Sequence, residues 1–147
     1  MKKLLLIICV CIVFSCKKDN ASENITAYNW VLKAQIISPA ITIDGKTSTD
    51  YLSLQNPEGC TKNFAYTFLE TGIFTFGSNG ALCDMIANTN SQKWKLEEDQ
   101  ITLDYGNGSS ATPPLKVNEN TLTQTSTITV NGTNYSLTST YVAQKIK

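Results

Sequence analysis

The sequence contains no histidine and no arginine. Without histidine it has no side chain that ordinarily titrates near neutral pH, no His-dependent catalytic triad and no His-ligated metal site. Without arginine it lacks the bidentate donor for phosphates and base edges, and its twelve lysines are balanced by twelve acids. We therefore expect a protein that is not an enzyme, holds no metal or other cofactor and binds no nucleic acid.

Charge is also absent from residues 4–14, an apolar run of eleven residues that follows Lys2-Lys3 and precedes Ser15. A basic start, an apolar stretch and a small residue at the cleavage point are typical of a secretory signal peptide. The run is too short for a transmembrane helix, which needs ~20 apolar residues. The sequence therefore predicts a cleaved signal peptide over residues 1–15.

The segment Val13-Phe14-Ser15-Cys16 resembles the lipobox of bacterial lipoproteins. The resemblance implies that the thiol of Cys16 carries fatty acyl chains such as palmitate, that cleavage occurs before Cys16, and that the protein is anchored to a membrane. Lys17 follows the cysteine where an Asp would resemble the inner-membrane retention signal. We therefore expect the cell envelope, at the outer membrane, with the face of that membrane left open.

The mature chain of 132 residues is long enough for one domain with one core. Its ten lysines and twelve acids give a formal charge of −2. Residues 16–24, the lipidated cysteine and a polar stretch without periodic apolar residues, are expected to form a tether. Residues 25–147 then form the folded domain.

Once the signal peptide is removed and Cys16 is lipidated, two cysteines remain, Cys60 and Cys83. An even pair in an oxidising envelope is expected to form a disulfide. It would close a loop of 24 residues, for which chain entropy gives roughly 3 kcal/mol of stabilisation. The alternative is a pair of free buried thiols.

From Tyr28 onward, apolar residues alternate with polar ones, which is the period of a β-strand. Asp44-Gly45 and Asn131-Gly132 are two-residue hairpin turns, the first joining residues 41–43 to a strand over residues 47–52. Helix is expected only as one turn within residues 22–29, capped by Ser22 or Asn24. The inner face of the first strand is expected to carry Tyr28, Trp30, Leu32, Ala34 and Ile36, and its outer face Asn29, Lys33 and Gln35.

The strand order and the aromatic loading resemble the lipocalin-like domains of bacterial lipoproteins over residues 25–145. The resemblance rests on Tyr28-Asn29-Trp30-Val31-Leu32, Cys60 followed by Phe64-Ala65-Tyr66-Thr67-Phe68, Gly72-Ile73-Phe74-Thr75-Phe76, Cys83 and Lys93-Trp94-Lys95-Leu96. It implies an all-β fold, an antiparallel up-and-down meander barrel of about eight strands. A ligand cavity is compatible with this fold, and the resemblance supplies no catalytic residue.

Eleven of the twelve aromatic residues of the mature chain fall in the inward register, with Tyr51 as the exception. An eight-stranded barrel is wide enough to be filled by side chains or to hold one small ligand. The sequence leaves both open, a solid aromatic core or an apolar pocket lined by Tyr66, Phe74, Tyr135 and Tyr141. Trp30 is expected to plug the closed end of the barrel.

Three polar residues, Gln124, Ser126 and Ser139, share the inward register of the last two strands. Buried polar groups need hydrogen-bond partners, and a few of them in an apolar pocket orient a ligand. They are therefore candidate ligand-binding residues. The alternatives are a bulge that turns them outward, or hydrogen bonds to one another or to water.

Two polar stretches of the sequence, residues 97–99 and 121–129, are expected to lie on the surface. The carboxylates of Glu97-Glu98-Asp99 lie on one tight turn and point apart, which does not suit glycoside hydrolysis. The alternate residues 121–129 are all threonines, which form a polar outer strand face of high β-propensity that meets solvent or a glycan.

These features predict a non-enzymatic envelope lipoprotein whose barrel binds or carries a small hydrophobic molecule. The alternative function is a filled barrel that serves as an interaction module for an envelope protein or a glycan, acting through loops 53–63 and 104–114.

Overall fold

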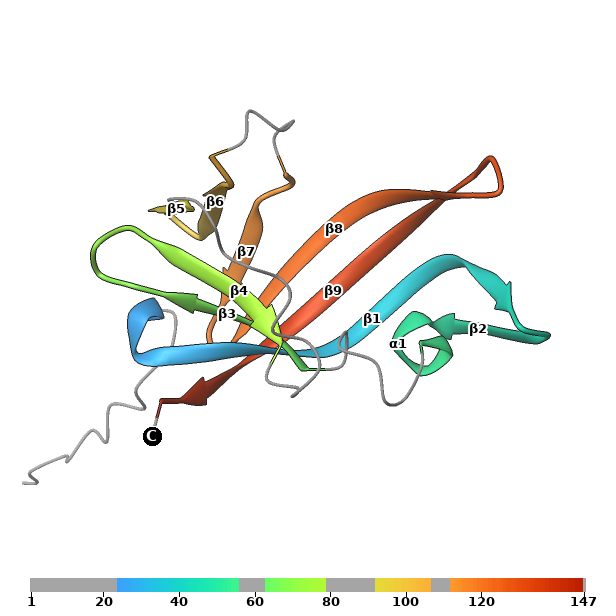
Figure 1. Cartoon of the computed structure of the whole chain (residues 1–147), viewed down its shortest axis with the longest axis horizontal. Coiled ribbons are helices and arrows are strands. Elements are labelled where there is room, and N and C mark those ends of the chain that lie inside the picture. Colours follow the sequence, from blue (N-terminus) through green and yellow to red (C-terminus); the bar gives the residue numbers. More distant parts are fainter. Residues whose placement is uncertain (1–23, 56–62, 79–91, 107–111, 147) are drawn as a thin grey trace, which may run out of the picture.

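The computed structural model describes residues 24–55, 63–78, 92–106 and 112–146 (Figure 1). Nearly all regular structure in these residues is β-strand. The elements are η2 (Ile25–Ala27), β1 (Tyr28–Ile43), β2 (Lys46–Asp50), α1 (Tyr51–Leu54), β3 (Phe64–Phe68), β4 (Phe74–Ser78), β5 (Lys93–Glu97), β6 (Gln100–Asp104), β7 (Leu115–Asn118), β8 (Thr121–Val130) and β9 (Thr133–Lys145).

The strands form one antiparallel sheet in the order β4-β3-β1-β9-β8-β7-β6-β5, with β2 paired to β1 outside this path. The two ends of the sheet meet at a bridge between Ile73 and Lys93. There the Phe74 N–H donates to the Gln92 carbonyl at 3.0 Å, and the Trp94 N–H donates to the Gly72 carbonyl at 2.9 Å. The sheet is therefore a nearly closed eight-strand barrel, which confirms the predicted all-β up-and-down fold.

Two hairpin turns are those that the sequence predicts. Asp44 and Gly45 join β1 to β2 with φ of 49° and 77°, and Asn131 and Gly132 join β8 to β9 with φ of 50° and 78°. Positive φ at both positions is the signature of a type I′ turn, whose twist matches that of the flanking strands.

One end of the barrel is closed by η2 and Trp30. The Trp30 side chain is fully buried, and its Nε1–H donates to the Ile25 carbonyl of η2 at 3.1 Å. This turn is the short helix expected before the first strand, but the Asn24 side chain does not cap it. The Asn24 Oδ1 instead accepts a hydrogen bond from the Thr26 hydroxyl at 2.9 Å.

A bulge at Lys33 reverses the inward face of β1. Leu32 pairs with Tyr141 and Ala34 pairs with Thr140, so Lys33 is an extra residue opposite β9. Because side chains alternate along a strand, one extra residue exchanges the two faces from that point onward. The prediction that Ala34 and Ile36 share the face of Trp30 is therefore wrong: Ile36 is 48% exposed and Ile37 is 0% exposed.

The first strand is also longer than predicted. β1 continues through residues 37–43 into an arm that it builds with β2, α1 and the far halves of β8 and β9 (Figure 1). The arm has its own apolar cluster, which is separate from the barrel core. Its buried residues are Ile37, Ile41 and Leu137.

The strand predicted over residues 47–52 ends at Asp50. The Asp50 Oδ1 accepts the Ser53 N–H at 3.1 Å and caps the short helix α1, because an Asp side chain satisfies a backbone donor that the first turn leaves free. Tyr51, expected outside the inward register, packs against the arm cluster from this helix.

The bulge predicts that substitution of two adjacent isoleucines lowers the stability by different amounts. We expect Ile37→Ala to lower the free energy of unfolding by about 2–4 kcal/mol, because it leaves a cavity in the arm cluster. Ile36→Ala should cost less than about 1 kcal/mol, because the side chain is half exposed. Urea denaturation of both variants measures the difference. A larger loss for Ile36→Ala would contradict the bulged register.

Candidate functional site

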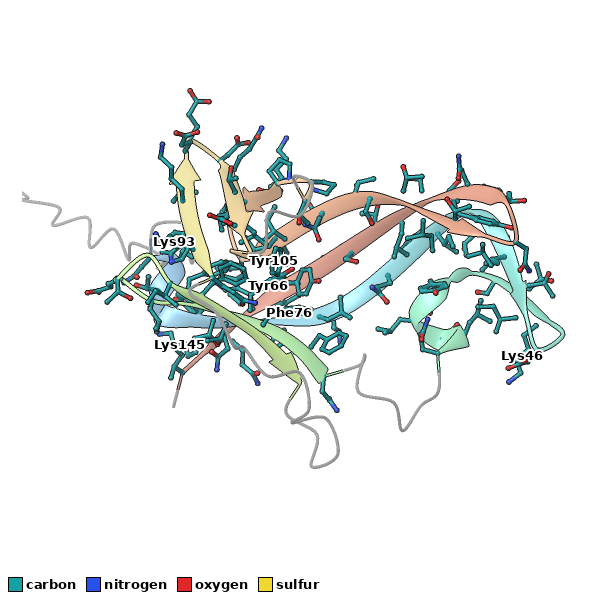
Figure 2. The ribbon with its side chains drawn as sticks, turned by 45° about the horizontal axis from the view of Figure 1, so that its top comes forward. Lys46, Tyr66, Phe76, Lys93, Tyr105 and Lys145 are labelled. Carbon is teal, nitrogen blue, oxygen red and sulfur yellow. The ribbon has the colours of Figure 1, made fainter. Side chains whose placement is uncertain are left out.

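Three tyrosines from different strands meet inside the barrel. Tyr66 lies on β3, Tyr141 lies on β9, and Tyr105 directly follows β6. The hydroxyls of Tyr66 and Tyr105 are 3.3 Å apart, and the ring centroids of Tyr66 and Tyr141 are 5.0 Å apart at 64°. Figure 2 shows Tyr66 and Tyr105 lying together with Phe76 beside them.

Burial keeps the hydroxyls of Tyr66 and Tyr141 protonated. It raises the pKa of Tyr66 far above its ordinary value, and the neighbouring Tyr141 and Tyr105 raise it further. Burial also raises the pKa of Tyr141 to about 12, against the opposing effect of hydrogen bonding with Tyr66 and Ser139. Tyr66 and Tyr141 are therefore neutral donors and acceptors at physiological pH, and neither supplies a tyrosinate base.

The interior around the tyrosines is filled with aromatic rings. Tyr66 lies 4.4 Å from Phe76 and 6.0 Å from Phe74, measured between ring centroids. Phe74 meets Tyr105 edge to face at 5.2 Å, a favourable geometry for aromatic pairs. Tyr66, Phe74 and Tyr141 are all buried. Three of the candidate ligand residues, Tyr66, Phe74 and Tyr141, therefore lie in a packed core.

A row of polar side chains crosses three strands next to this core. Gln35 of β1 is paired with Ser139 of β9, and Ser139 is paired with Gln124 of β8. The Gln35 Nε2–H donates to the Ser139 hydroxyl at 3.1 Å, and the Gln124 Nε2–H donates to the Pro113 carbonyl at 2.6 Å. We call Gln35, Ser139 and Gln124 the polar row.

The polar row retains one open acceptor. The Gln35 Oε1 is buried and has no hydrogen-bond partner among the described residues. A buried acceptor without a donor is unfavourable by about 1–3 kcal/mol, so most such groups in proteins are satisfied. Sequence reasoning missed Gln35 because the alternation before Lys33 places it on the outer face.

The polar row separates two apolar regions. On one side lies the barrel core, and on the other lies the arm cluster around Ile37 and Leu137. The remaining candidates, Ser126 and Tyr135, lie beyond the row: Ser126 is paired with Leu137, and Tyr135 packs against the arm cluster. The structure therefore places Gln124 beside Ser139, whereas Ser126 and Tyr135 lie further along the β8–β9 pair.

Between β1 and α1 the surface is hollowed into an open groove of about 340 Å³. The groove is lined by Leu32, Lys33, Ala34, Ile36, Asp50, Leu52 and Ser53. It follows the stretch of β1 that lies between its pairing with β3 and its pairing with β2. It therefore opens on the edge of β1 at the bulge.

The acidic turn 97–99 lies on the surface, as the sequence predicts. Glu97 forms an ion pair with Lys95, whose hydrogen bond lowers the pKa of the Glu97 carboxyl. Asp99 lies 3.9 Å from the ammonium of Lys116. All four side chains are more than half exposed, so the carboxylates are those of a solvated turn.

The predicted lipidation and disulfide cysteines do not belong to the part of the chain that the structure describes. Cys16, Cys60 and Cys83 lie outside the described residues. Within the described ranges, no group of three or more His, Cys, Asp or Glu side chains is arranged to hold a metal ion. Nor is any helix in that part of the chain long and apolar enough to span a membrane.

The fold and the site define an all-β, nearly closed up-and-down barrel with a partly buried polar row at the junction of barrel and arm. Comparisons of the chain with protein-family models, curated proteins and solved structures give no match.

The tyrosine cluster predicts a loss of stability at alkaline pH. The pKa of Tyr141 is about 12 in the folded protein and 10.0 as a free side chain. The stabilisation that the protonated Tyr141 hydroxyl gives to the folded state is therefore intact below pH 10 and is lost as the pH rises towards 12. We expect Tyr141 alone to lower the free energy of unfolding by roughly 1 kcal/mol between about pH 8 and pH 11.

Circular dichroism and tyrosinate absorbance, recorded together against pH, measure this effect. Ionisation of the cluster should coincide with loss of structure. The Tyr66→Phe variant should lose less stability over the same pH range, because its most strongly shifted hydroxyl is gone. Free titration of all tyrosines near pH 10 in the folded protein would contradict the prediction.

Proposed function

We propose that the protein is a non-enzymatic lipoprotein of the cell envelope whose barrel binds a small, neutral, amphipathic molecule at the polar row. The observation that carries the proposal is the buried, unpartnered Oε1 of Gln35. A hydroxyl or amide N–H of a ligand at this position removes the penalty of the open acceptor.

The surroundings of the polar row support a neutral ligand. Its three residues have uncharged amide and hydroxyl side chains. They therefore do not offset the free-energy cost of removing a carboxylate or an ammonium group from water. The half-buried Phe64, Phe76 and Tyr105 pack against the adjacent core and offer apolar surface to a ligand tail. A few polar groups beside apolar walls are the usual composition of a small-molecule site.

The proposed location favours the same ligand class. The lipobox-like segment ending at Cys16 supports an acyl anchor, and burial of acyl chains contributes ~0.8 kcal/mol per CH₂. The eight residues 17–24 that follow Cys16 span at most ~30 Å. The barrel then lies close to the outer membrane, where lipid-like molecules are abundant.

Binding of a long-chain alcohol tests the site. The purified full chain should bind the alcohol and bind an alkane of equal length more weakly, because only the alcohol donates to Gln35. Gln35→Leu should weaken alcohol binding by about 2–10-fold and leave alkane binding unchanged. The matched control is Gln144→Leu on the exposed end of β9, which should change neither.

Isothermal titration calorimetry measures these affinities, and native mass spectrometry of the purified chain detects a retained ligand. Absence of both retained and added ligand would refute the proposal. Equal loss of alcohol and alkane binding in Gln35→Leu would indicate a collapsed site without the proposed hydrogen bond.

The membrane anchor has a separate test. We expect Cys16→Ser to move the protein from the membrane fraction to the soluble fraction, because the acyl chains have no other attachment site in the proposal. Fractionation with metabolic labelling by palmitate measures both effects. Continued labelling and sedimentation of the variant would contradict the anchor, and protease treatment of intact cells would show which face of the membrane exposes the barrel.

The second candidate function is an interaction module for an envelope protein or a glycan. The filled core favours it, because the side chains of Trp30, Phe68, Phe74 and Leu122 are fully buried in the barrel core. Crosslinking in cells through loops 53–63 and 104–114 distinguishes the two functions, since an interaction module is trapped with a partner and a carrier retains a ligand.

A further inference from the structure

The far half of β8 has one strand neighbour where a strand inside a sheet has two. β7 pairs with β8 only at Thr121, Leu122 and Thr123. β9 pairs with β8 along its whole length. Over residues 124–130 the other edge of β8 therefore has no paired strand among the described residues, and Figure 1 shows this half of the β8–β9 hairpin projecting from the barrel.

The register shows which backbone groups this edge presents. The Ala143 N–H donates to the Asn120 carbonyl at 3.0 Å, one position before the paired residues Thr121 and Val142. In an antiparallel pair, hydrogen-bonded and non-hydrogen-bonded positions alternate. Even-numbered residues of β8 therefore bond to β9, and the N–H and C=O of Thr125, Thr127 and Thr129 point away from it.

Residues 124–130 carry none of the features that block free strand edges. The segment contains no charged residue and no proline, and its outward-facing threonines are exposed. Natural sheets protect such edges with lysine, proline or bulges. Seven residues at about 3.3 Å each make an open edge of roughly 23 Å.

We propose that this edge of β8 pairs antiparallel with the same edge of a second copy of the chain, about a two-fold axis at Thr127. The axis places Thr127 opposite its own copy and Thr125 opposite Thr129. Each facing pair exchanges two backbone hydrogen bonds, and β9-β8 of one copy continues into β8-β9 of the other.

The chemistry of the edge favours a copy of the chain as the occupant. A two-fold pairing sets the residue on the axis against its own copy and every other residue against its mirror position, so a charge on the axis would meet a like charge. This edge has none, and it presents the same residue type at all three outward positions. Threonine pairs across antiparallel strands are favourable.

Cysteine crosslinking of the full chain in its membrane tests the pairing. Facing residues of a hydrogen-bonded pair have Cα atoms about 5.5 Å apart, which suits a disulfide. Thr127→Cys should therefore give a covalent dimer under mild oxidation. Ser136→Cys is the matched control, because Ser136 lies opposite Thr127 on β9 and is also exposed. In the proposed dimer Ser136 lies three strand spacings, about 14 Å, from Ser136 of the other copy. The Ser136→Cys variant should therefore form no covalent dimer.

A second pair of variants tests the same interface without a new cysteine. Thr127→Lys places two like charges on the axis and should raise the dimer dissociation constant at least ~10-fold, whereas Ser136→Lys should change it less than ~2-fold. Sedimentation of the detergent-extracted protein measures both, and circular dichroism verifies that each variant is folded.

A monomeric Thr127→Cys variant, or equal crosslinking of the two cysteine variants, overturns the proposal. So does a crosslink of Thr127→Cys to a protein of another mass, which would assign the edge to a different extended segment. A dimer that survives Thr127→Lys unchanged places the contact elsewhere on the surface.

Discussion

The pairing of β1 with β9 is the constraint on which the rest of the structure depends. The N-terminal half of β1 belongs to the barrel, where it lies between β3 and β9, and its C-terminal half belongs to the arm. β9 pairs with β1 from Tyr28 to Ser38, so the pairing runs along the barrel part and into the start of the arm. Because the two parts share one continuous strand pair, the apolar contents of the barrel and of the arm are fixed relative to each other.

The bulge at Lys33 lies within this pairing and determines what the interior contains. Up to Leu32 the inward residues of β1 are even-numbered, and beyond the bulge they are odd-numbered. Without the extra residue, Ile36 would enter the arm cluster and Gln35 would face outward. The partly buried hydrogen bond from Gln35 to Ser139, and the unpartnered carbonyl oxygen of Gln35 beside it, therefore follow from a single inserted position.

Closure of the barrel protects its strand edges unevenly. The bridge between Ile73 and Lys93 joins β4 to β5, and the Trp30 indole with η2 covers one end. Among the described residues the arm has no such closure along β8, because β7 leaves that strand after Thr123. The same elongation that creates the junction with the polar row therefore also leaves a row of β8 backbone groups without a strand partner in this part of the chain.

Much of the architecture was readable from the chain because its signals are local. Period-two alternation and the Asp44-Gly45 and Asn131-Gly132 turns predict antiparallel hairpins, and short connections between successive strands lead to a meander. The short helix at Tyr51 had a local signal that was missed, since Asp50 stands three residues before Ser53, the spacing of a helix cap.

The candidate site was only partly readable. Gln124 and Ser139 were found because the last hairpin is regular. Gln35 was missed because its partner lies 104 positions away in the sequence and the bulge exists only in the pairing of those two strands. The sequence by itself determined the strand period and the turns, each of which depends on neighbouring residues. Only the tertiary structure decided which face of β1 points inward beyond Lys33, since register is a property of two strands brought together.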